Sequence, residues 1–239
     1  MRRPRKPAHL PLYLFFALFG LIAMPAMAEN SAPVNWRLPA LKAIDLLGKS
    51  VDLQAIGQAG KGLVVFFHST TCPVSRQYGP TIARLEKELG QKGLAVVIIN
   101  PVATDPADSM RELVSRFSPD TFYIHDKDEK LATALGARST TEVLLFDKAL
   151  TLRYRGAVDD QFAVGTALEK PRHNYLTDAV ADLLADQEIT VAVTDPSGCS
   201  LDFEKAGTDH TTVTYHNQIS RIIQKNCVEC HRDGGLGPF

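Results

Sequence analysis

The chain has 239 residues, of which 22% are charged and 45% are hydrophobic. This composition is typical of a globular protein and excludes a collagen-like or intrinsically disordered chain. The 26 Lys and Arg residues nearly balance the 27 Asp and Glu residues, so the charge does not favour nucleic acid as a partner.

The first 28 residues have the organisation of a secretory signal peptide. The basic stretch Arg2–Lys6 precedes the apolar run Leu12–Met24, and Ala26-Met27-Ala28 supplies small residues around a cleavage point. The alternative is an uncleaved membrane anchor, but the apolar run is shorter than the ~20 residues that a spanning helix needs. We therefore predict cleavage near Glu29 and a protein that is periplasmic or otherwise exported, with no membrane span in the mature chain. Residues 29–239 carry 22 basic and 27 acidic residues, a net charge of −5.

Strand and helix patterns alternate between residues 63 and 186. Short β-branched or aromatic runs predict strands buried on both faces, and amphipathic runs predict helices. The predicted strands are Leu63–His68, Leu94–Asn100, Thr121–His125, Glu142–Phe146 and Thr151–Tyr154. The predicted helices are Pro80–Leu89, Asp105–Phe117, Lys127–Leu135 and Arg172–Asp186, with Pro80 in a first turn and Gly90 as a helix stop.

This order of elements predicts a three-layer α/β domain over residues 34–190. Its sheet is mixed, because a parallel half is followed by an antiparallel hairpin around Asp147-Lys148-Ala149-Leu150. Residues 191–210 break the pattern and are predicted to form a linker. Residues 211–239 are predicted to form a second, short helical unit.

Cys72 lies where the first strong strand ends and a helix begins, in His68-Ser69-Thr70-Thr71-Cys72-Pro73. The N-terminus of a helix stabilises a thiolate, which is the nucleophilic form of cysteine. This position favours redox or covalent sulfur chemistry, and the alternative is a buried, inert cysteine. His68 and Arg76 are the nearest groups that could tune Cys72; a strand-end histidine and a solvated arginine are the alternatives.

With this strand order and cysteine turn, residues 34–186 resemble the thioredoxin-like superfamily, in its redoxin and peroxiredoxin branch. The resemblance implies a thioredoxin-like fold and, as one activity, thiol–disulfide exchange. Thioredoxins carry Cys-x-x-Cys, whereas Ser75 occupies the second position here. Cys72 must therefore form mixed disulfides or use a distant partner.

The peroxiredoxin pattern Pro-x-x-x-Thr-x-x-Cys is not preserved. Val65 stands at the proline position and Ser69 at the threonine position. Thr141 occupies the place of the thioredoxin-type cis-proline or the peroxiredoxin arginine, and Arg138 precedes it by three residues. These departures argue against peroxidase activity.

The C-terminal Cys227-Val228-Glu229-Cys230-His231 matches the attachment sequence of c-type haem. Cys227 and Cys230 would hold the porphyrin, and His231 would be the proximal iron ligand. The preceding Tyr215–Gln224 predicts an amphipathic helix, and the whole arrangement resembles the start of a class I cytochrome c domain. We predict one covalent haem c. A zinc site that adds His216 or His210 and a redox disulfide are the alternatives.

Eight residues follow His231, and no methionine follows Met110. The distal haem ligand is therefore not identified. The tail that ends in Gly237-Pro238-Phe239 resembles the haem-motif segment of larger bacterial proteins that continue into a copper monooxygenase-like region, and we expect the chain to be a fragment.

Cys72 and Cys199 remain as an even pair in an oxidising compartment. We predict that Cys199, in the linker, resolves Cys72; an unpaired Cys199 is the alternative. The sequence thus predicts an exported redox protein with a thiol site (Cys72, Ser75, Cys199), a haem for electron transfer, and periplasmic redox proteins as partners. A non-catalytic binding or assembly module, with haem or metal binding as its only chemistry, is the alternative.

Overall fold

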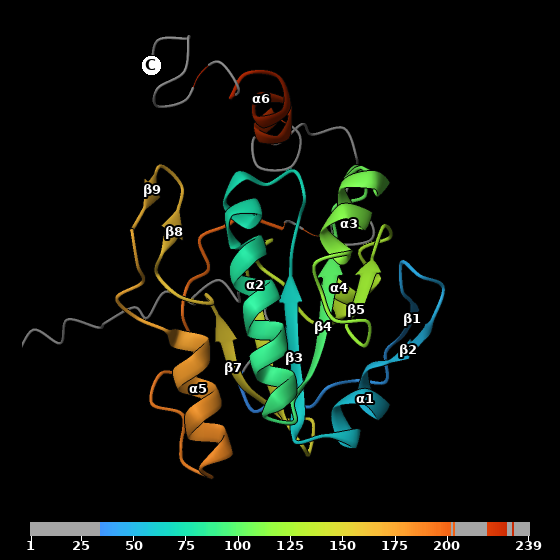
Figure 1. The fold of residues 1–239 in the computed structure, drawn as a ribbon, viewed down its shortest axis with the longest axis vertical. Coiled ribbons are helices and arrows are strands. Elements are labelled where there is room, and N and C mark those ends of the chain that lie inside the picture. The colour runs from blue at the N-terminus through green and yellow to red at the C-terminus, as the bar shows by residue number, and fades with distance from the viewer. Residues whose placement is uncertain (1–33, 202, 204–218, 229–230, 232–239) are drawn as a thin grey trace, which may run out of the picture.

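A five-stranded sheet forms the centre of the computed structural model, which describes residues 34–201, 203, 219–228 and 231 (Figure 1). The predicted signal peptide and Cys230 lie outside the described residues. In spatial order the strands are β5 (Phe122–His125), β4 (Ala95–Asn100), β3 (Gly62–Phe67), β6 (Val143–Asp147) and β7 (Leu152–Gly156). β3, β4 and β5 are parallel, β6 pairs antiparallel with β3, and β7 pairs antiparallel with β6. This is the mixed sheet that the sequence predicts.

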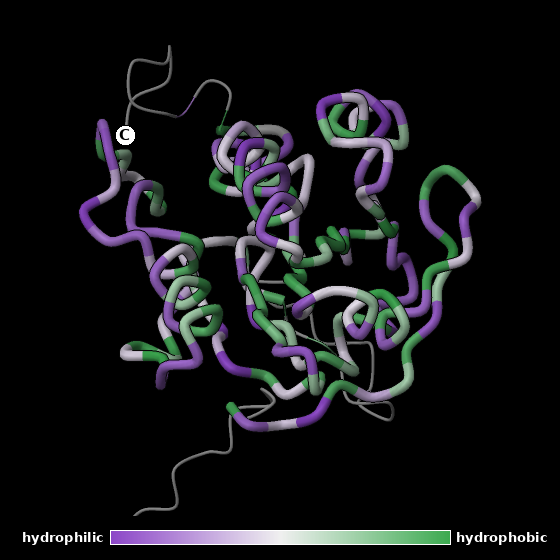
Figure 2. The backbone as a smooth tube through the Cα atoms, turned by 60° about the horizontal axis from the view of Figure 1, so that its bottom comes forward, coloured by the Kyte–Doolittle hydropathy of each residue, from purple (hydrophilic) through white to green (hydrophobic). Residues whose placement is uncertain are grey.

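Helices cover both faces of the sheet, because its strands are apolar on both sides. One hydrophobic cluster joins the sheet to α2 (Pro73–Gln91), α3 (Ala107–Val114) and α5 (Tyr175–Leu184). A second cluster, on the opposite face, includes α1 (Leu53–Ala59) and α4 (Lys130–Ala134). In Figure 2 the helices alternate between hydrophobic and hydrophilic residues along their turns, as packing on one side requires.

Helix α2 is longer than the predicted helix. It begins at Pro73 and continues through Pro80 to Gln91, so the prediction of Pro80 in a first turn and Gly90 as a stop was wrong. Proline inside a helix removes one backbone hydrogen bond. The helix continues because Tyr78 and Ile82, on either side of Pro80, are buried against the sheet, and this burial offsets the lost bond.

Two short hairpins lie outside the sheet and were not predicted. β1 (Lys42–Ile44) pairs with β2 (Ser50–Asp52), and β8 (Phe162–Ala163) pairs with β9 (Thr166–Ala167). Strands of two or three residues are too short for the alternating pattern that identifies a strand in a sequence.

Residues 191–201, the first half of the predicted linker, pack on the domain. Val193 forms a parallel bridge with Arg155 of β7, and Ser200 forms an antiparallel bridge with Ser139. Further along the chain, α6 (Ser220–Asn226) lies at the N-terminal end of α2 (Figure 1). Among the described residues, no helix is long and apolar enough to cross a membrane.

Candidate active site

Cys72 is the residue that immediately precedes α2. Its backbone is extended, with φ −71° and ψ 121°, and Pro73 begins the helix. The side chain is buried, with 2% of its surface exposed. The sulfur therefore lies at the N-terminal end of a nineteen-residue helix, as the sequence predicts.

The structure brings Cys199 into direct contact with Cys72. The Cys199 thiol donates a hydrogen bond to Cys72 Sγ, with 2.8 Å between the sulfur atoms. Thr140 positions Cys199 twice: its backbone N–H donates to the Cys199 carbonyl (3.0 Å), and its hydroxyl accepts from the Cys199 backbone N–H (3.2 Å). Gly198 allows this approach, because a Cβ atom there would collide with the Ser139 and Thr141 side chains.

The two sulfur atoms differ in acidity. The hydrogen bond from Cys199 lowers the pKa of Cys72 to about 6, against the opposing effect of burial, and hydrogen bonds from the Thr140 side chain and the Ser75 backbone add to it. The pKa of Cys199 is raised, because its thiol is the donor to Cys72 and because it is partly buried. Cys72 is thus the thiolate of the pair at neutral pH, and Cys199 holds the proton.

Ser75 holds the loop before α2 and has no side-chain hydrogen bond to sulfur among the described residues. Its hydroxyl accepts from the Ser69 backbone N–H (2.8 Å) and donates to the Thr140 carbonyl (2.9 Å). The side chain is buried, with 1% exposed. Ser75 thereby joins the cysteine loop to the segment that positions Cys199.

Asp105 is a buried carboxylate, and its sequence pattern predicted only the start of a helix. It accepts from the Thr70 backbone N–H (2.6 Å), the Asn100 amide (2.8 Å) and the hydroxyls of Ser69 and Thr71. The carboxyl ends of β3 and β4 meet here, because the two strands are parallel neighbours. The sequence therefore held a signal for this contact: an acidic residue that follows β4 is expected to lie near the loop that follows β3.

The segment before β6 does not place an arginine at Cys72. The Arg138 guanidinium donates to Glu142 Oε1 (2.9 Å) and to the Thr194 carbonyl (2.9 Å). Thr141 is buried, and its backbone N–H donates to Ser139 Oγ (3.3 Å). The described peptide bonds are all trans. These residues belong to the segment before β6 that contacts Cys199.

Of the predicted haem residues, the structure describes Cys227 and His231. The Cys227 backbone N–H donates to the Ile223 carbonyl and the His231 N–H to the Cys227 carbonyl, each at 2.8 Å. No group of three or more metal-binding side chains occurs among the described residues. The helix before the motif reaches the thiol site, because Gln224 Nε2 of α6 donates to Cys199 Sγ at 3.4 Å.

A mixed sheet with helices on both faces, and a cysteine between β3 and α2, defines a thioredoxin-like fold. Residues 28–191 match the model of the Redoxin family. The chain belongs to the Redoxin family, which confirms the predicted fold. The matched region ends before α6 and the Cys-x-x-Cys-His motif.

Two curated proteins and a solved structure are similar to this chain. The thiol-disulfide oxidoreductase ResA of Halalkalibacterium halodurans is 26% identical over 136 residues, 57% of this chain and 72% of that protein. The thiol:disulfide interchange protein DsbE of Yersinia pestis is 30% identical over 137 residues, 56% of this chain and 69% of that protein. A hypothetical protein from Sinorhizobium meliloti 1021 has the same fold, with a TM-score of 0.64, 23% identity, and coverage of 73% of this chain and 97% of that one.

Proposed function

We propose that the chain is a thiol–disulfide oxidoreductase in which Cys72 is the nucleophile and Cys199 the resolving cysteine. The observation that carries this proposal is the contact of 2.8 Å between the two sulfur atoms. The similarity to ResA, a thiol-disulfide oxidoreductase, and to DsbE, a thiol:disulfide interchange protein, supports it.

The first step is attack on a substrate disulfide. The Cys72 thiolate forms a bond to one substrate sulfur, and the bond between the two substrate sulfurs breaks. The other substrate sulfur leaves as a thiolate, which takes a proton. The lowered pKa of Cys72, about 6, keeps the attacking thiolate populated at neutral pH.

The second step releases the bound substrate. Cys199 loses its proton and attacks Cys72 Sγ, which forms a Cys72–Cys199 disulfide and expels the second substrate thiol. The pair is oxidised by two electrons and the substrate disulfide is reduced by two, so the balance is complete. In a Cys-x-x-Cys site, the second cysteine is the resolving thiol. Ser75 occupies that position here and has no thiol, so Cys199 takes this role from another segment of the chain.

The test is disulfide exchange with oxidised glutathione, followed by peptide mapping. We expect a Cys72–Cys199 disulfide in the product, no exchange in Cys72→Ser, and a trapped glutathione adduct on Cys72 in Cys199→Ser. Gly198→Ala should slow release of the adduct, because the added Cβ displaces Cys199. Gly90→Ala, with open space around its Cβ, is the matched control.

If glutathione is released from Cys199→Ser as fast as from the wild-type chain, Cys199 is not the resolving cysteine. Unchanged exchange in Cys72→Ser would contradict the whole assignment and would favour a non-catalytic binding module.

We also propose that the C-terminal motif carries one covalent haem c. The observation that favours it is the hydrogen bond from the His231 backbone N–H to the Cys227 carbonyl, which brings these two residues close together. His231 is exposed and Cys227 is half-buried, so both residues fit a group attached at the surface. Cys227 and Cys230 would hold the porphyrin and His231 would bind the iron, which would supply one-electron transfer.

The haem proposal is tested by a pyridine haemochrome spectrum of chain exported from cells competent for cytochrome c maturation. We expect a c-type band that survives acid-acetone extraction and is lost in the Cys227→Ala/Cys230→Ala double variant. Absence of covalent haem in the wild-type chain would overturn it and would leave a dithiol or metal site.

We further propose export to the periplasm, with redox proteins of that compartment as partners. The basic and apolar segments of residues 1–28 support this. Mass spectrometry of the periplasmic fraction should find a mature chain that begins at Glu29. An intact N-terminus on cytoplasmic protein would contradict export.

A further inference from the structure

His68 is a buried histidine that takes part in neither step of the proposed disulfide exchange. It follows β3 and lies in a polar stretch of loop, with 2% of its surface exposed. Neither ring nitrogen has a hydrogen-bond partner among the described residues, and the same is true of the Thr70 hydroxyl. Buried polar groups without partners are rare, because each costs free energy when it leaves water. These two groups indicate a site that another molecule completes.

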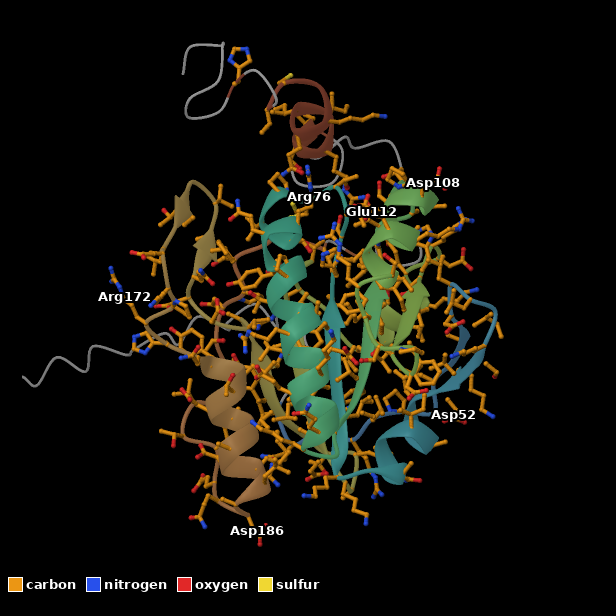
Figure 3. The ribbon with its side chains drawn as sticks, in the orientation of Figure 1. Asp52, Arg76, Asp108, Glu112, Arg172 and Asp186 are labelled. Atoms are coloured by element: carbon orange, nitrogen blue, oxygen red, sulfur yellow. The ribbon has the colours of Figure 1, made fainter. Side chains whose placement is uncertain are left out.

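Both groups line one pocket between α2 and α3. Its volume is about 440 Å³, which lies within the range of small-molecule sites. Arg76 of α2, Ser109 and Glu112 of α3, and Arg116 just beyond α3 complete its polar lining. Figure 3 shows Arg76 and Glu112 at the same end of the molecule, where α2 and α3 face each other. We call this the α2–α3 pocket.

The rim of the α2–α3 pocket carries a positive charge that no described residue neutralises. Arg116 Nη2 forms an ion pair with Glu112 Oε1 at 2.9 Å. The Arg76 side chain is exposed and forms no ion pair with any described residue. The pocket therefore combines one unpaired guanidinium at its rim with unsatisfied hydrogen-bonding groups inside.

The interior of the pocket is suited to an oxygen-rich ligand. Burial lowers the pKa of His68 to about 4, so the imidazole is neutral at pH 7 and offers one N–H donor. The Thr70 hydroxyl is a second donor. Two donors inside and a guanidinium at the rim are the groups that bind carboxylates and phosphates.

We propose that the α2–α3 pocket binds a small molecule with a carboxylate or phosphate group, which Arg76 pairs and to which His68 and Thr70 donate hydrogen bonds. Neither Cys72 nor Cys199 lines this pocket. The inference does not depend on the proposed oxidoreductase activity.

The test uses the full chain with ¹⁵N-labelled histidine, titrated at pH 7 with sodium phosphate or sodium acetate. Sodium chloride at the same ionic strength is the reference. We expect a saturable shift of the His68 ring signals with at least one of the two probes. A response to phosphate alone identifies a phosphate site, and a response to acetate alone identifies a carboxylate site.

Two variants locate the binding. Arg76→Gln should weaken it by about tenfold or more, since it removes a charged hydrogen-bond donor. Thr70→Val should weaken it while the backbone bond from Thr70 to Asp105 remains. Arg84→Gln is the matched control, because Arg84 lies on α2 and pairs with Glu88.

The proposal is overturned if neither probe shifts His68 beyond the chloride reference. It is also overturned if Arg76→Gln binds as tightly as the wild-type chain. Activity of the thiol pair enters neither readout, so failure here and failure of the proposed function are distinguishable.

Discussion

At the scale of single residues, the acidity of Cys72 depends chiefly on one donor. The Cys199 thiol is the largest cause of the lowered pKa, and burial acts in the opposite direction. Without Cys199, the helix terminus and the weaker donors still lower the pKa of Cys72, but they offset less of the increase that burial causes. The reactivity of Cys72 therefore depends on a residue 127 positions further along the chain.

Cys199→Ala should raise the pKa of Cys72 from about 6 toward the ordinary value of 9.0. The rate of alkylation by iodoacetamide, followed against pH in a Cys227→Ala/Cys230→Ala background, measures this midpoint. Alkylation at pH 7 should slow by about tenfold, because the thiolate fraction falls. A midpoint that stays near 6 in the variant would show that the helix terminus and the remaining donors set the acidity without Cys199.

Asp105 stabilises the cysteine loop through four donors from two separate parts of the chain, the loop itself and Asn100 at the end of β4. Asp105→Ala leaves the Thr70 N–H and the Asn100 amide without their acceptor and should cost at least about 2 kcal/mol of unfolding free energy. Asp105→Asn should cost less, since the Ser69 and Thr71 hydroxyls can turn to accept.

Urea denaturation measures both Asp105 variants. Asp108→Asn is the control, because Asp108 is exposed and forms a surface pair with Arg111, and its effect should stay within about 0.5 kcal/mol. Equal stability of Asp105→Ala and the wild-type chain would rule out a stabilising role for this carboxylate.

At the scale of elements, periodicity predicted the strands of the sheet and most of the helices. It failed where local patterns were too short, as in β8 and β9, and where tertiary burial overrode a local breaker, as at Pro80 in α2. The order of strand, Cys72 and Pro73 in the sequence also predicted that Cys72 immediately precedes a helix. Thr140 could not be predicted, because its role arises where separate segments of the fold meet.

A buried ion-pair network joins β6, β7 and the segment after α5. Glu142, fully buried at the start of β6, accepts from Arg155 Nη2 (2.8 Å) and Arg138 Nε (2.9 Å), while Arg138 also donates to the Thr194 carbonyl. This network fixes residues 192–195 against the sheet, and so holds the chain that leads to Cys199.

Glu142→Ala should destabilise the fold by about 3–5 kcal/mol, because it leaves the Arg155 guanidinium buried without this carboxylate. Guanidinium chloride denaturation measures the loss. Glu88→Ala removes an exposed partner of Arg84 and should change stability by less than about 1 kcal/mol. Similar losses in the two variants would mean that the buried network adds nothing beyond a surface pair.

At the scale of the whole molecule, α6 connects the thiol pair to the Cys-x-x-Cys-His motif. Gln224 of α6 contacts Cys199, and Cys227 is the residue that immediately follows the helix. A helix of seven residues is marginal on its own, so α6 depends on its contacts with the domain. One of those contacts is made to Cys199, a member of the sulfur pair whose single negative charge is lost on oxidation.

The stability of α6 should therefore depend on the redox state of the sulfur pair. In the reduced chain the Cys72–Cys199 pair carries a negative charge, which favours the Gln224 donor and the nearby positive Arg221. Oxidation to a disulfide removes that charge, so both interactions weaken. Hydrogen–deuterium exchange of residues 219–228 should therefore be several-fold faster in the oxidised chain than in the reduced one.

The matched variant for the exchange measurement is Gln224→Ala, in which the difference between the two redox states should shrink while exchange in α2 stays unchanged. Lys225→Ala, which alters an exposed neighbour on α6, should keep the full difference. If α6 exchanges at the same rate in both states of the wild-type chain, the thiol pair does not control the segment that carries Cys227 and His231. If the difference is found, disulfide chemistry at Cys72 alters the stability of the helix that leads into that motif.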